Sequence, residues 1–172
     1  MIATVSDSRL GRAHRVGVPD AIRSGDEIDA PDYASAFEVT LANADAYSAE
    51  QCARRAFEGA PRALRWFVLM GWTTVLRLRL GPRTSTDYVL GWKLAAATPG
   101  GPEPGRVTLE VHSSLITARK VVEVERSRVT VTTFVRYERR LGRRIWSALA
   151  PVHHLTEPLL LTLAASRRNA GS

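Results

Sequence analysis

The first run of alternating apolar and polar positions predicts a half-buried strand that begins at Tyr33. Its inward-facing residues are expected to be Phe37, Val39 and Leu41. No comparable periodicity is sustained over residues 1–32, which contain no aromatic residue. We therefore expect the folded part of the chain to start at this strand and residues 1–32 to form a flexible or loosely docked arm.

The spacing then changes to that of helices. Ser48 and Gln51 have the residue types of a capping box, so a short helix is expected to begin there. Gly59 and Pro61 are typical of one helix ending and the next beginning. The second helix is predicted to stop by Gly81 and to direct a set of apolar residues towards the core. These residues are Leu64, Phe67, Val68 and Val75.

Period-two patterns dominate the middle of the chain and predict about five clear strands in all, joined by short connections and therefore antiparallel. A continuous strand is expected to place Tyr88, Leu90, Trp92 and Leu94 on one face. Three further strands follow the loop at residues 99–105, with a hairpin at residues 125–128 between the last two. Their inward positions include Val107, Leu109, Val111, Ala118, Val122, Val124, Val129, Val131, Thr133, Val135 and Tyr137.

A long amphipathic helix is predicted over residues 141–166. Its apolar stripe is expected to contain Ile145, Leu149, Val152, Thr156, Leu159 and Leu163. Pro151 and Pro158 lie seven residues apart on the opposite face, where each removes a backbone donor and favours a bend. The alternative is two shorter helices separated near residues 156–158.

Composition narrows the class of protein. The chain has 172 residues, a length typical of one globular domain. Its single cysteine, Cys52, excludes an intrachain disulfide, and the clustered ligands of a structural zinc site are absent from the sequence. No apolar stretch is long enough to span a membrane, and the N-terminal residues lack the apolar core of a signal peptide. We expect a cytoplasmic protein with no metal and no cofactor.

The positive charge belongs to the folded part. Of 24 cationic residues only Lys93 and Lys120 are lysines, and the formal net charge is +7. Residues 1–32 carry four arginines and six acids, which leaves +9 on residues 33–172. The excess of arginine over lysine is explained equally by GC-rich coding or by selection for anion binding.

We expect a domain at residues 33–167 and a disordered tail at residues 168–172.

The order of one strand, two helices, a run of antiparallel strands and a long C-terminal helix resembles the helix-grip fold of the START-like superfamily. That superfamily includes polyketide cyclases, aromatase/cyclases and lipid-transfer proteins. The sequence is most similar to bacterial members in which the last strand leads into a basic turn and a helix with a Pro-x-His element, here residues 134–146 followed by Pro151-Val152-His153. The resemblance implies an α+β fold in which a curved antiparallel sheet wraps around the C-terminal helix. It also implies an apolar cavity between the two that holds a hydrophobic small molecule or lipid.

Six residues are candidates for lining that cavity: Tyr88, Trp92, Lys120, Tyr137, Leu149 and His153. Lys120 interrupts an apolar strand face, where it would orient a ligand carbonyl or carboxylate, or else turn to solvent at a bulge. His153 is a candidate acid or base, or alternatively a structural histidine. Tyr88, Trp92 and Tyr137 would stack on a planar ligand or simply fill the core. His154 and His112 are expected to face water.

Three functions remain open at this point. The leading one is binding of a hydrophobic small molecule or lipid without covalent catalysis. The second is a polyketide-cyclase type of enzyme in which His153, Lys120 or Tyr137 polarises a carbonyl group. The third is a basic module that contacts anionic lipid, with nucleic acid the weaker option because no reading motif accompanies the charges. Its surface would consist of Arg136, Arg139, Arg140, Arg143 and Arg144.

Overall fold

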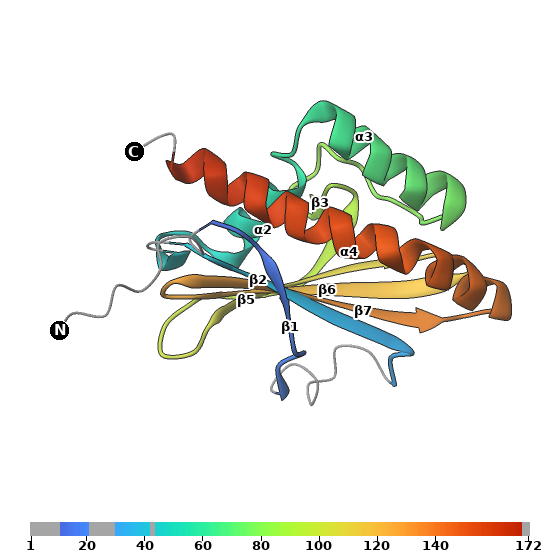
Figure 1. The fold of residues 1–172 in the computed structure, drawn as a ribbon, viewed down its shortest axis with the longest axis horizontal. Coiled ribbons are helices and arrows are strands. Elements are labelled where there is room, and N and C mark those ends of the chain that lie inside the picture. The colour runs from blue at the N-terminus through green and yellow to red at the C-terminus, as the bar shows by residue number, and fades with distance from the viewer. Residues whose placement is uncertain (1–10, 21–29, 42–43, 170–172) are drawn as a thin grey trace.

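The computed structural model describes residues 11–20, 30–41 and 44–169, and within them the strands form one antiparallel sheet in the order β1-β2-β7-β6-β5-β4-β3. The strands are β1 (His14–Val16), β2 (Tyr33–Thr40), β3 (Tyr88–Val89), β4 (Trp92–Thr98), β5 (Gly105–His112), β6 (Ile116–Glu125) and β7 (Arg128–Tyr137). The sheet is curved but not closed, and α4 (Arg140–Asn169) runs across one of its faces (Figure 1). This confirms the predicted α+β class.

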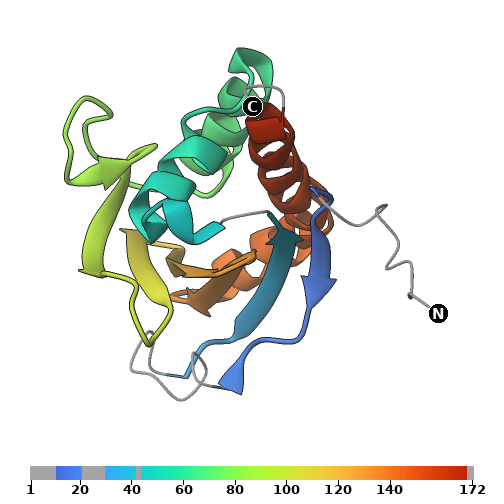
Figure 2. The ribbon, with the colours of Figure 1, turned by 90° about the vertical axis from the view of Figure 1, so that its left-hand side faces the viewer.

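Two short helices lie on the same side of the sheet as α4, as the end-on view in Figure 2 shows. They are α2 (Ala49–Phe57) and α3 (Arg62–Met70), preceded by a 3-10 turn η2 (Ala44–Ala46) and continued by a π-helical segment η3 (Gly71–Val75). The capping box at the start of α2 is confirmed, because Gln51 N donates to Ser48 Oγ at 3.2 Å and Ser48 N donates to Gln51 Oε1 at 3.0 Å.

The prediction that the second helix directs four apolar residues into the core was wrong for two of them, whereas Leu64 packs against the core. Val68 is buried, but the side chains of Phe67 and Val75 remain 52% and 42% exposed. The reason is that α3 lies beside α4 and away from the sheet (Figure 1), so little of its surface is covered.

A tight turn replaces the continuous strand expected over residues 88–94. Leu90 and Gly91 both have positive φ, 47° and 87°, which is the backbone of a two-residue hairpin turn. Val89 therefore pairs with Trp92 and Tyr88 pairs with Lys93. Because directly paired residues share a face, Tyr88 lies on the face opposite Trp92, and the expectation that the two share a face was wrong.

The C-terminal segment is one continuous helix that includes both prolines, so the alternative of two separate helices was wrong. Its inward face is rotated from the predicted stripe, because Val152 and Leu159 are 37% and 45% exposed. The buried side chains on the inward face are those of Trp146, Glu157, Leu160, Leu161 and Ala165. The inward face of α4 thus includes Glu157, an acidic residue that was not part of the predicted apolar stripe.

Part of the predicted N-terminal arm is docked on the sheet. β1 pairs with β2 in antiparallel register, with His14 opposite Glu38 and Val16 opposite Ala36. The backbone N of Ala13 also donates to Thr162 Oγ1 of α4 at 3.0 Å. Residues 1–10 and 21–29 of the arm lie outside the described residues, as do residues 170–172 of the predicted tail, whereas α4 itself extends to Asn169.

Candidate functional site

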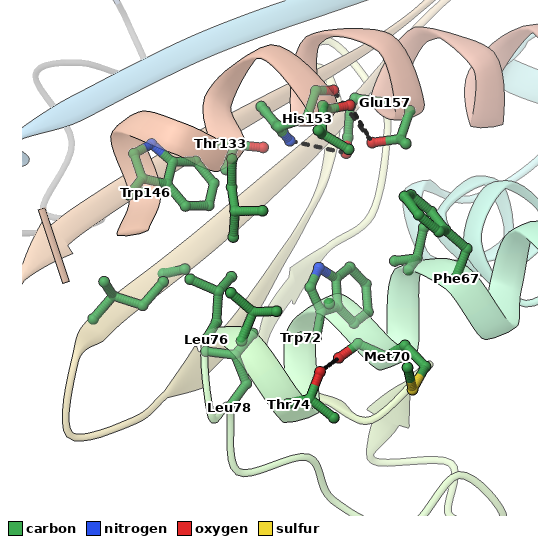
Figure 3. A pocket seen from close by; sticks show the side chains of 18 of the residues that line it. Phe67, Met70, Trp72, Thr74, Leu76, Leu78, Thr133, Trp146, His153 and Glu157 are labelled. Atoms are coloured by element: carbon green, nitrogen blue, oxygen red, sulfur yellow. Dashed lines mark hydrogen bonds and ion pairs between the residues drawn. The ribbon is translucent and has the colours of Figure 1, made fainter. Parts of the chain in front are cut away.

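A cavity of about 310 Å³ lies between α4, the α3–η3 segment and the central strands of the sheet. Its lining is overwhelmingly apolar, and Figure 3 shows residues of α4 facing Leu76 and Leu78 across the space. The apolar lining residues include Phe67, Met70, Trp72, Leu76 and Leu78 from α3, η3 and the segment after them, Trp92, Ile116 and Ala118 from the sheet, and Trp146, Leu149, Val152 and Leu160 from α4. The volume falls at the lower end of the range of small-molecule sites.

Large apolar side chains that are exposed to solvent surround the opening of this cavity. Trp66 is 64% exposed, and with Phe67, Met70 and Val75 it lines the α3–η3 side. The partly exposed Val152 lines the α4 side. The cavity is therefore open to solvent between two helices rather than sealed in the core.

A buried ion pair lies in the wall of the cavity. Lys120 Nζ of β6 is 2.6 Å from Glu157 Oε1 of α4, and both side chains are only 4% exposed. Lys120 Nζ also donates to Thr133 Oγ1 of β7 at 3.1 Å. The ammonium lies over the rings of Phe57 and Trp92, at 5.3 and 5.6 Å from their centroids. Burial of a lysine at this depth is possible because a carboxylate and a hydroxyl compensate for its lost hydration.

His153 lies next to this pair, one helical turn before Glu157. Its Nδ1 is 3.7 Å from Glu157 Oε2, and its Nε2 forms a 3.1 Å hydrogen bond with Ser35 Oγ. Burial lowers the pKa of His153 well below its usual value of 6.5, and the nearby positive charge of Lys120 lowers it further. The carboxylate of Glu157 does not reverse this shift, because Lys120 already neutralises it. At neutral pH the ring is therefore uncharged.

This neutral, buried His153 should make the protein acid-sensitive. Its pKa is lower in the folded state, so the unfolded chain binds a proton first as the pH falls below about 6.5, and unfolding is favoured by up to about 1.4 kcal/mol per pH unit. We expect His153→Gln to make chemical denaturation curves less pH-dependent between pH 7 and pH 5. His112→Gln, at an exposed position, is the control. Equal pH dependence of wild type and His153→Gln would contradict this account.

His154 is half-buried, and the prediction that it faces water was wrong. Its Nε2 is 2.6 Å from Tyr33 OH, and the two rings are stacked with centroids 6.2 Å apart. Burial and the charge of Arg15 lower the pKa of His154, and burial raises the pKa of Tyr33. A neutral phenol and a neutral imidazole therefore share this hydrogen bond. His112 is exposed, as predicted.

Four of the six predicted cavity residues line the cavity, namely Trp92, Lys120, Leu149 and His153. The structure places Tyr88 and Tyr137 outside the lining. The ring of Tyr88 packs on Gly81, on the far side of the hairpin turn. Tyr137 has the predicted strand face, but it is the last residue of β7, and its backbone N donates to Asp32 Oδ2.

The predicted arginine surface is mostly exposed. Arg139, Arg140, Arg143 and Arg144 face solvent around the start of α4. Arg136 is half-buried and forms an ion pair with Glu138 at 2.9 Å. Four of the five side chains are thus accessible to an anionic partner.

Sequence reasoning missed Glu157, Thr133 and Ser35 as parts of the polar cluster. Glu157 follows His153 by four residues, which places the two on one helix face, and this spacing was the available signal.

In the described part of the chain, no group of three His, Cys, Asp or Glu side chains is arranged to hold a metal ion. None of the described helices combines the length and apolar character required to cross a bilayer.

Comparisons with known proteins assign no relative to the chain. No protein-family model, no curated protein and no solved structure matches it significantly. The cavity and its residues are therefore the features that bear on function.

Proposed function

We propose that the chain is a START-like protein that binds a hydrophobic small molecule or lipid between the sheet and α4. The apolar cavity carries this proposal, since its volume suits a small ligand and its opening is surrounded by exposed apolar side chains. The element order and the single C-terminal helix over a curved antiparallel sheet are consistent with a helix-grip arrangement.

A bulky substitution inside the cavity tests this proposal. Leu149 is half-buried and lines the cavity, so Leu149→Trp should occupy space that the ligand needs. We expect the affinity for the neutral fluorescent probe N-phenyl-1-naphthylamine to fall at least about tenfold, which corresponds to about 1.4 kcal/mol.

The matched control is Leu155→Trp, which lies on the same helix but is 73% exposed and is not a lining residue. It should bind the probe like the wild type. Native mass spectrometry of gently purified wild-type protein should in addition detect a co-purified hydrophobic compound. Absence of probe binding by the wild type, or equal binding by Leu149→Trp and wild type, would overturn the proposal.

A second candidate function is a carbonyl-polarising enzyme of the polyketide-cyclase type. The observation in its favour is that Lys120 and His153 both line the cavity and both lie next to Glu157. Tyr137, the third residue considered for this role, lies outside the lining. Turnover of an aromatic polyketone that is lost in Lys120→Met would favour the enzyme over a binding protein.

A further inference from the structure

We propose that the cavity selects an uncharged hydrophobic molecule and discriminates against the carboxylate of the same carbon skeleton, with Glu157 as the residue that determines this specificity. This inference rests on the proposed function and adds the chemical class of the ligand. It follows from the charges that the cavity wall already contains.

The charges in the wall cancel one another. Lys120 contributes one positive charge and Glu157 one negative charge, 2.6 Å apart. His153 is neutral, because burial and Lys120 lower its pKa. Among the described lining residues Lys120 and Glu157 are the only charged side chains at neutral pH. An ionised ligand would therefore bring a net charge into a space with almost no polar surface, which is unfavourable.

Two of the three donors of Lys120 are also occupied. Its ammonium has three protons, of which one is directed to Glu157 and one to Thr133. The rings of Phe57 and Trp92 lie over the same ammonium and further restrict access to it. A ligand carboxylate would have to compete with Glu157 for Lys120 while lying close to a second negative charge. Glu157 is thus an internal counter-ion in the position that an acidic ligand would take.

The same geometry predicts how the specificity can be reversed. Glu157→Gln keeps the size of the side chain but removes its charge, which leaves Lys120 without a counter-ion. A ligand carboxylate would then restore neutrality. Glu157→Gln should therefore gain affinity for an acid and lose its preference for the neutral molecule.

The experiment compares decan-1-ol with decanoate at pH 8, where decanoate is ionised, by displacement of N-phenyl-1-naphthylamine. We expect wild-type protein to bind decan-1-ol at least about tenfold more tightly than decanoate, and Glu157→Gln to reverse that order. Decanoate should also raise the Tm of Glu157→Gln but not that of the wild type. Glu123→Gln is the matched control, since it removes a carboxylate that pairs with Arg106 outside the cavity.

The two proposals fail in different ways. If the wild type binds neither the probe nor decan-1-ol, the proposed function is wrong. If the wild type binds decanoate as tightly as decan-1-ol, the cavity binds ligands but the inference about their charge is wrong. The wild-type comparison decides this even if Glu157→Gln does not fold. Lys120→Met, which retains the carboxylate, should still bind decanoate at least about tenfold more weakly than decan-1-ol, and equal binding of the two by that variant would likewise overturn the inference.

Discussion

Replacing Glu157 by leucine should lower the free energy of unfolding by about 3–5 kcal/mol, because it leaves the ammonium of Lys120 buried without a counter-ion. Both side chains are 4% exposed, so water cannot substitute for the lost carboxylate. Urea denaturation followed by circular dichroism measures the change. The effect should exceed that of breaking the exposed pair of Arg128 and Glu125, where solvent already screens both charges.

The double variant Lys120→Met/Glu157→Leu separates the charge effect from packing. It removes both charges and fills the space with apolar atoms of similar length, so most of the lost stability should return. If the double variant is as unstable as Glu157→Leu alone, the loss came from the shape of the leucine rather than from an unpaired ammonium.

Gly142→Ala should destabilise the protein by about 1–3 kcal/mol, although glycine to alanine in a helix is ordinarily stabilising. Gly142 is buried in the first turn of α4, where a Cβ atom would overlap the backbone carbonyl of Leu115. That carbonyl oxygen accepts a 3.0 Å hydrogen bond from Glu138 N, which joins the connection between β7 and α4 to the residue before β6. Relief of the overlap would have to displace backbone, which is costly.

Gly71→Ala is the matched control for this prediction. Gly71 is also helical, with φ −58° and ψ −43°, but a Cβ there would meet no atom within 4 Å. The substitution should therefore be neutral or stabilise by up to about 1 kcal/mol. If thermal denaturation shows the two variants shifted in the same direction, the difference in packing between Gly142 and Gly71 does not determine the effect, and the prediction is wrong.

The sheet was largely predictable from the sequence because strand alternation is a local property. Lys120 was placed correctly on the inward face by counting along β6. The alternation of apolar and polar residues along a strand could not identify the counter-ion of Lys120, because Glu157 lies 37 residues later in the sequence, on α4. Burial of an unpaired lysine is energetically unfavourable, which argued against an inward position for Lys120. The ion pair with Glu157 compensates for this cost.

Two predictions failed because periodicity in the sequence does not show where a strand turns or what covers an apolar helix face. Leu90 and Gly91 form a turn with positive φ, and this reverses the face on which Tyr88 lies. The apolar residues of α3 were predicted to be core, because periodicity identifies an apolar face but not what covers it. In the structure that face adjoins the cavity opening, and Phe67 lies there half exposed.

Strand β1 has a consequence for association between copies of the chain. A strand at the edge of a sheet offers unpaired backbone groups on which another chain can add a strand. Without β1, alternate residues of the eight-residue strand β2 would present such groups, because the other edge of β2 is paired with β7. β1 pairs with three residues of β2, and the hydrogen bond from Ala13, the residue before β1, to Thr162 connects this segment to α4. The described stretch that contains β1 has two arginines and one aspartate, Arg12, Arg15 and Asp20, and by pairing with β2 it reduces the edge that is available to another chain.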